Sequence, residues 1–140
     1  MRIVVDSNVL VSASFWNGDS ERIIALAESK KLELFLSKEI IDEFTRVLGY
    51  EDIKRKIRDK GLEMKRTVEK IEAISTIIEP KIKIKAVIDD PSDDKFIECT
   101  VEARADYLIS KDKHLLKMKS FRDIDIITPK EFLKKLAANN

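Results

Sequence analysis

The 140-residue sequence contains very little cysteine, histidine, glycine and proline. Cys99 is the only cysteine, which excludes a disulfide framework and a zinc site made of thiolates. With only His114 to help it bind a metal, we expect Cys99 to pack as a small apolar residue on a helix. Glycine and proline number three each, and glutamine is absent.

Long hydrophobic runs are absent too. No stretch approaches the roughly 18 consecutive apolar residues of a membrane span, and the N-terminus leads directly into a strand pattern without the features of a signal peptide. We therefore expect a soluble cytoplasmic protein that does not associate with membranes. The length suits a single domain, residues 1–140, with a substantial core.

Neither sign of charge is in excess, because 27 basic and 26 acidic residues leave a net charge of +1. Charged residues nevertheless make up 38% of the chain, well above the roughly 25% of an average domain. This composition is typical of a heat-adapted surface rich in ion pairs, a hypothesis that a melting temperature in the ordinary mesophilic range would contradict. On such a surface a single charged residue is usually just solvated, so an acid is assigned a function only where other acids are expected beside it.

Strand and helix patterns alternate along the chain. Strands are predicted at residues 3–5, 32–36, 81–88, 107–110 and 124–127. Helices are predicted at 7–15, from 19 or 20, after Ser37, over 51–78 in two pieces broken near Gly61, from the 89–94 segment to 104, as a turn near 115, and after the capping box that begins at Thr128. This order predicts a three-layer α/β/α sandwich with a central, mostly parallel, about five-stranded sheet.

Asp6 follows directly after the β-branched run Ile3, Val4 and Val5. Such a run is typical of a strand buried on both faces in a parallel sheet, so Asp6 is expected at the carboxyl end of a central strand, where α/β proteins bind ligands. Taken alone, Asp6 is better explained as a cap of the next helix.

Two further segments place acids in similar positions. Asp112 follows the strand at 107–110, and it too could be only a helix cap. The 89–94 segment holds four aspartates where a helix begins: Asp90 and Asp93 suit capping roles, which leaves Asp94 in the first turn as the favoured metal ligand. The spacing does not exclude Asp90 or Asp93 as the ligand instead.

Glu43 supplies a fourth acid from the helix after Ser37. At about 100° per residue, it is the acid of that helix closest to the apolar stripe that faces the core. Gathering Asp6, Glu43, Asp94 and Asp112 would be costly, because like charges raise one another's pKa values. A divalent cation removes that cost, and a site with only oxygen ligands favours Mg²⁺ or Mn²⁺.

These four segments together resemble the PIN-domain nuclease family, over residues 1–129. The resemblance is carried, in this order, by residues 3–10 (IVVDSNVL), 37–44 (SKEIIDEF), 90–98 (DPSDDKFIE) and 105–112 (ADYLISKD). The family's acidic residues fall on Asp6, Glu43, Asp94 and Asp112. Its hydroxyl residue two positions before the last acid is Ser110 here, where threonine is commoner.

The resemblance implies a metal-dependent endoribonuclease. Asp6 and Asp94 would be direct ligands of Mg²⁺ or Mn²⁺, and Ser7, Asn8 and Ser110 would orient the carboxylates. The bound metal would activate water for in-line attack on an RNA phosphodiester. The DPSDD form is most similar to the prokaryotic branch of toxin components of toxin–antitoxin pairs, which implies an antitoxin partner and a homodimer.

Basic residues surround these acids in the sequence. Lys111, Lys113, Lys117 and Lys119 lie just beyond Asp112, accompanied by His114 and Arg122, and two further basic clusters occupy residues 54–60 and 81–85. A basic rim suits binding to an RNA backbone, although solvated surface explains each cluster equally well. Trp16 could stack on a base or be buried.

Two other functions fit parts of this pattern. A degenerate PIN module would bind RNA or protein without cutting, and the full set of four acids argues against it. A phosphatase with a carboxylate site would use the first acid as nucleophile, often in an Asp-x-Asp pattern, whereas Ser7 and Asn8 follow Asp6 here.

Overall fold

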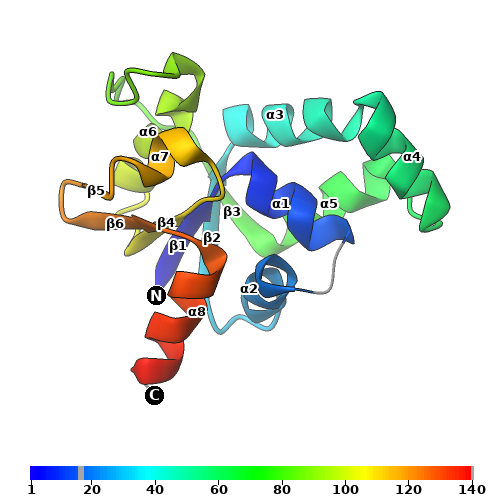
Figure 1. Ribbon diagram of the computed structural model, residues 1–140, viewed down its shortest axis with the longest axis horizontal. Coiled ribbons are helices and arrows are strands. Elements are labelled where there is room, and N and C mark those ends of the chain that lie inside the picture. The colour runs from blue at the N-terminus through cyan, green and yellow to red at the C-terminus, as the bar shows by residue number, and fades with distance from the viewer. Residues whose placement is uncertain (16–17, 140) are drawn as a thin grey trace.

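The computed structural model of the protein describes residues 1–15 and 18–139 (Figure 1). Within them, six strands form one sheet in the order β3-β2-β1-β4-β6-β5, and all neighbours are parallel except β5 and β6. The strands are β1 (Arg2–Val5), β2 (Glu33–Ser37), β3 (Ser75–Ile78), β4 (Tyr107–Ile109), β5 (Ser120–Phe121) and β6 (Ile124–Ile127). The predicted α/β class with a mostly parallel sheet is confirmed, with six strands rather than about five.

Helices cover both sides of this sheet. In Figure 1, α6 and α7 lie on one side of the central strands β1 and β2, and α1 to α5 lie on the other. The helices are α1 (Ser7–Phe15), α2 (Asp19–Glu28), α3 (Lys38–Leu48), α4 (Glu51–Asp59), α5 (Met64–Ile74), the 3₁₀ turn η1 (Pro91–Asp93), α6 (Asp94–Glu102), α7 (Lys113–Leu116) and α8 (Pro129–Ala138). None of the helices in the described part of the chain is long and apolar enough to cross a membrane.

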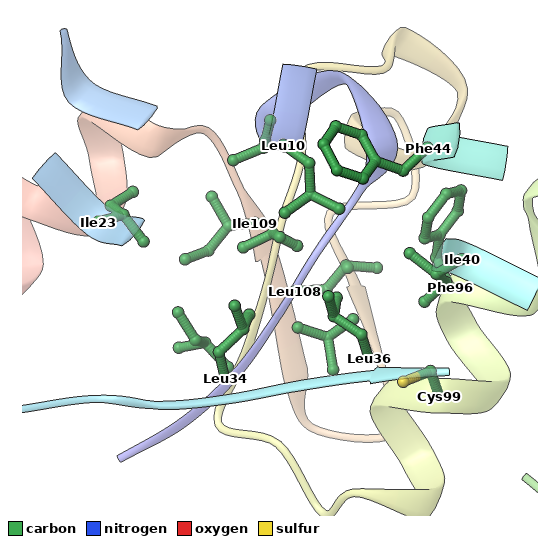
Figure 2. Close-up of a cluster of buried hydrophobic side chains, with 14 of the residues drawn as sticks. Leu10, Ile23, Leu34, Leu36, Ile40, Phe44, Phe96, Cys99, Leu108 and Ile109 are labelled. Atoms are coloured by element: carbon green, nitrogen blue, oxygen red, sulfur yellow. The ribbon is translucent and has the colours of Figure 1, made fainter. Parts of the chain in front are cut away.

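The core is built around β1. Ile3, Val4 and Val5 are completely buried, as expected for a continuous β-branched run that has a strand on either side and helices on both faces. Figure 2 shows side chains from α1, α3, α6 and strands β2 and β4 meeting around it, with Leu10 beside Phe44. Cys99 lies in the same core, as predicted, and burial raises the pKa of its thiol to about 12.

The predicted strand at residues 81–88 is wrong: this segment belongs to no strand of the sheet. Its backbone N–H groups are instead bonded to carboxylates of α6. Lys81 N donates to Glu102 Oε1 at 3.0 Å and Ile84 N to Glu98 Oε2 at 2.9 Å. The alternation of lysine with apolar residues in the sequence does not carry over to burial, since Ile84 and Val87 are buried whereas Ile82 and Ile88 are exposed. Extended backbone can satisfy its N–H groups with side chains as well as with a strand.

The edge of the sheet is formed by β3, which the periodicity predicted as the end of a helix. β3 pairs in parallel with β2 from Ser75 to Ile78. Helix α5 ends at Ile74, just before the run Ser-Thr-Ile-Ile, whose β-branched residues favour strands over helices. The two-residue strand β5 was not predicted. It is too short to show a period and pairs with β6 through a tight turn in which Arg122 and Asp123 have positive φ.

Helix starts were predicted more accurately. Ser37 Oγ accepts a hydrogen bond from Ile40 N at 3.3 Å, and Thr128 and Glu131 form the predicted capping box of α8. The charged helix α4 lies at the periphery in Figure 1, and Ile57 is its buried residue. These caps fix where α3 and α8 begin relative to the strands that precede them.

Candidate metal centre

A polar pocket of about 210 Å³ opens where β1 and β4 end. Helices α1, α3 and α7 and the turn η1 all begin at or run past this edge, so their polar side chains converge on it. Five acids are among the lining residues, which are Asp6, Ser7, Asn8, Glu43, Arg46, Val47, Tyr50, Asp90, Ser92, Asp93, Phe96 and Asp112. Residues separated by more than 100 positions in the sequence thus share one pocket.

Asp6 lies at the bottom of the pocket and is 2% exposed. Its Oδ1 accepts a hydrogen bond from Val9 N at 2.9 Å, so Asp6 does cap α1. Its Oδ2 accepts from Ser110 Oγ and from Lys111 N, the latter at 3.1 Å. Burial raises the pKa of Asp6, while these hydrogen bonds act in the opposite direction and nearby Asp112 adds to the increase. The capping role and the pocket role therefore coexist in one side chain.

Ser110 connects two of the acids. Its hydroxyl donates to Asp6 and accepts from Asp112 N at 2.9 Å. Asp112 in turn caps α7, because its Oδ1 accepts from His114 N at 2.7 Å. The structure thus brings Asp112 to the pocket and places Ser110 where it can orient both acids.

Glu43 reaches the pocket from α3, with both carboxylate oxygens in contact with other groups. Its Oε2 accepts from Ser7 Oγ at 2.5 Å, and its Oε1 lies 2.9 Å from Lys95 Nζ and 3.8 Å from an Arg46 guanidinium nitrogen. Ser7, which the resemblance implies as a residue that orients the carboxylates, thus contacts one of the acids directly. Among the described residues, the side chain of Asn8 is hydrogen-bonded to none of these acids, although it lines the pocket.

Asp94 does not lie in this pocket, contrary to the position expected from the sequence. Its Oδ1 accepts hydrogen bonds from Ala86 N at 3.1 Å and Val87 N at 2.8 Å, and it lines a separate surface hollow. Asp94 is the first residue of α6, whereas Asp93 closes the 3₁₀ turn η1. Because successive helical residues point about 100° apart, only one of the two can face the pocket, and it is Asp93.

Asp93 is the most strained acid of the cluster in electrostatic terms. It is 5% exposed, and its Oδ2 is buried without a hydrogen-bond partner among the described residues. Burial raises the pKa of Asp93 to about 7, and the nearby charges of Asp112, Asp90 and Glu43 and a close side-chain contact with Asp112 act in the same direction. A buried carboxylate oxygen without a partner is costly, so the arrangement calls for a positive ligand.

Three acids offer oxygens close enough to share one cation. One carboxylate oxygen from each of Asp90, Asp93 and Asp112 lies within 4.8 Å of the other two. Asp90 also caps η1 through its Oδ1, which accepts from Ser92 N at 3.2 Å. An all-carboxylate donor set with an orphaned buried oxygen fits a hard cation such as Mg²⁺ or Mn²⁺. Asp90 and Asp93, which the spacing had left open, are thus the acids brought together with Asp112.

The basic residues beyond Asp112 lie at the surface. Lys111, Lys113, Lys117 and Lys119 are exposed; Lys111 donates to Ser12 Oγ at 3.2 Å, and Lys117 forms an ion pair with Asp89 at 3.0 Å. Their role in RNA binding stays a prediction. Trp16, the candidate stacking residue, lies outside the described residues. Lys95 was not predicted as a site residue, because the direction of its side chain depends on how η1 joins α6.

The family comparison agrees with this geometry. The chain matches the family described as PIN domain over residues 2–114, a range that contains all five acids of the pocket. A comparison with curated proteins finds no match. The chain belongs to the PIN domain family, a family of metal-dependent nucleases.

Proposed function

We propose that this protein is a metal-dependent endoribonuclease that hydrolyses RNA at the acidic pocket. The observation that carries the proposal is the buried Oδ2 of Asp93, which has no partner among the described residues and lies in the cluster with Asp90 and Asp112. A group of this kind is stable when a cation completes it. Asp90, Asp93 and Asp112 would hold Mg²⁺ or Mn²⁺.

The bound cation would supply Lewis-acid chemistry, lowering the pKa of a water molecule and neutralising charge on the phosphate. The protein's own groups prepare the pocket for it. Val9 N, Lys111 N and Ser110 Oγ hold Asp6 in one orientation, and Ser7 fixes Glu43. Fixed carboxylates cost little reorganisation when the substrate arrives.

RNA as the substrate rests on the family resemblance together with the basic surface. The backbone N–H of Lys111 touches Asp6, and its exposed ammonium group extends away to Ser12. Lys113 lies in the first turn of α7, beside the cap residue Asp112. Cations next to the acids would attract phosphates and offset the repulsion between RNA and the carboxylates.

A phosphatase mechanism fits the pocket poorly. A nucleophilic aspartate needs an accessible oxygen, but both oxygens of Asp6 accept hydrogen bonds and the residue is 2% exposed. The favoured chemistry is therefore hydrolysis assisted by a cation rather than by a covalent aspartyl intermediate.

The cleavage assay uses a mixed panel of labelled RNAs with Mn²⁺, with Mg²⁺ and with a chelator. Wild type should cut with either metal, and Asp6→Asn should lose activity by about 100-fold or more, as expected for a group at the reacting centre. Asp42→Asn is the matched control, since Asp42 is exposed on the same helix as Glu43. Wild type that binds RNA without cutting it would instead indicate a catalytically weak PIN module in RNA processing.

The toxin role, the antitoxin and the homodimer also belong to this proposal, and they rest on the DPSDD form of residues 90–94. A toxin should arrest growth when expressed alone and recover when a small protein encoded beside it is co-expressed. Light scattering should give twice the mass of the chain. Expression without any effect on growth would contradict the toxin role and leave the ribonuclease proposal standing.

A further inference from the structure

Lys95 places a shielded ammonium group beside the acidic pocket. Its side chain is 11% exposed, and its Nζ lies 2.9 Å from Glu43 Oε1. The same Nζ donates a hydrogen bond to Ser92 O and lies 5.3 Å from the centroid of the Phe96 ring. Lysine rarely gives up hydration to this extent unless it is paired, so the ion pair with Glu43 compensates for the lost hydration of the Lys95 ammonium group.

The other lysine ion pairs that were identified among the described residues are much more exposed to solvent. The pair of Lys117 with Asp89 has a similar length of 3.0 Å, but the side chain of Lys117 is 75% exposed. Exposed pairs of this kind contribute little. Lys95 and Glu43, with side chains 11% and 18% exposed, are far less screened by solvent.

We propose that Lys95 is an internal counter-cation of the metal centre, which holds Glu43 out of direct metal ligation and lowers the affinity for a divalent ion. The inference rests on the proposed metal-dependent function. Both oxygens of Glu43 are already occupied, by Lys95 and by Ser7, whereas Asp93 Oδ2 has no partner among the described residues. The positive charge of Lys95 stabilises the crowded acids without metal and repels an incoming cation.

The direction of this effect separates it from a purely structural role. A residue that only supports the shape of the pocket would weaken metal binding when replaced. A counter-cation would strengthen metal binding when its charge is removed, because the acids of the pocket would then lose their shielded positive group. Among the described residues that line the pocket they would keep only Arg46, which is 63% exposed and lies 3.8 Å from Glu43. Replacement should also destabilise the metal-free protein, for the same reason.

The test is a calorimetric titration of metal-free protein with Mn²⁺. Lys95→Gln removes the charge but can still donate a hydrogen bond, and it should lower the Mn²⁺ dissociation constant by about tenfold or more. Lys95→Arg keeps the charge and should stay within about twofold of wild type, as should the exposed control Lys117→Gln. In the presence of chelator, the melting temperature of Lys95→Gln should be lower than that of wild type. Adding Mn²⁺ should raise the melting temperature of Lys95→Gln by more than it raises that of wild type.

Each outcome decides the question. Lys95→Gln that binds Mn²⁺ with wild-type affinity or more weakly would overturn the inference, even if wild type binds the metal and cuts RNA. Lys95→Gln that folds only with Mn²⁺ would support it, because the metal would be replacing the missing ammonium group. Tighter Mn²⁺ binding by a protein that cuts no RNA would support the inference and contradict the proposed function.

Discussion

Asp93 and Asp94 are adjacent in the sequence but have different environments. The Oδ2 of Asp93 is buried in the acidic pocket without a partner among the described residues, whereas Asp94 accepts two backbone N–H groups of the segment beside α6. We therefore expect Asp93→Asn to weaken Mn²⁺ binding by more than the roughly 10–100-fold typical of groups around a metal site. Asp94→Ala should keep the affinity and lower the free energy of unfolding by about 1–3 kcal/mol, because two N–H groups lose their acceptor.

Calorimetric Mn²⁺ titration and urea unfolding of both variants check this pair. The opposite pattern, with metal binding lost in Asp94→Ala and kept in Asp93→Asn, would show that Asp94 rather than Asp93 binds the metal.

The stability of the metal-free protein should depend on pH through Asp93. Its pKa is raised to about 7, against about 3.9 in an unfolded chain. Between those values the folded state binds a proton that the unfolded state does not, so the contribution of Asp93 to stability is lost as the pH rises through about 7. Burial raises the pKa of Asp6 as well, which acts in the same direction.

Urea unfolding in chelator at pH 5, 6, 7 and 8 measures this dependence. Asp93→Asn should remove much of the decline in the free energy of unfolding, so that the variant becomes more stable relative to wild type as the pH rises. A difference between the two proteins that is constant across this range would rule out the assigned pKa.

At the scale of elements, α6 holds the segment at residues 81–88 by a row of carboxylates. Glu98 is the buried member of the row, 7% exposed, and accepts from Ile84 N. Glu98→Ala should lower the free energy of unfolding by about 1–3 kcal/mol, because a buried N–H loses its acceptor. Hydrogen exchange at Ile84 should accelerate. The exposed Glu79 supplies the control variant Glu79→Ala, and equal effects of the two replacements would contradict a specific role for Glu98.

Helix α8 depends on the capping box at its start. Thr128 Oγ1 accepts from Glu131 N at 3.2 Å, and the Glu131 side chain accepts from Thr128 N at the same distance. Thr128→Ala should cost about 1 kcal/mol in urea unfolding, and Thr128→Ser should cost much less because serine caps equally well. If Thr128→Ser is as damaging as Thr128→Ala, the methyl packing of Thr128 rather than its cap is what matters.

At the scale of the whole molecule, the α/β class and the central strands could be predicted from patterns that persist over several residues. The buried run at Ile3–Val5, the cap at Ser37 and the capping box at Thr128 each reflect a local physical rule that the structure obeys. The segment at 81–88 does not follow the alternation of its sequence, because Ile82 and Ile88 are exposed. It lies along α6, while β3 forms the edge of the sheet. Which of two candidates joins a sheet is decided by tertiary packing.

The site, like the fold, was predicted where local patterns decide the position of a residue and missed where tertiary packing decides it. That Asp6, Glu43 and Asp112 would meet followed from their positions after strands or beside the apolar stripe of a helix. The choice between Asp93 and Asp94 depended on how the 3₁₀ turn η1 joins α6, a geometry that spacing alone does not fix. Lys95 depends on the same join, so its contact with Glu43 could be found only in the structure.

The most direct measurement of the central claim is anomalous scattering from crystals soaked in Mn²⁺. A peak is expected among the carboxylates of Asp90, Asp93 and Asp112, with Asp6 lining the same pocket and Asp94 outside it. The peak should be absent in crystals of Asp93→Asn. A Mn²⁺ peak beside Asp94, or fully soaked wild-type crystals without a peak in the pocket, would show that Asp90, Asp93 and Asp112 do not form the metal site.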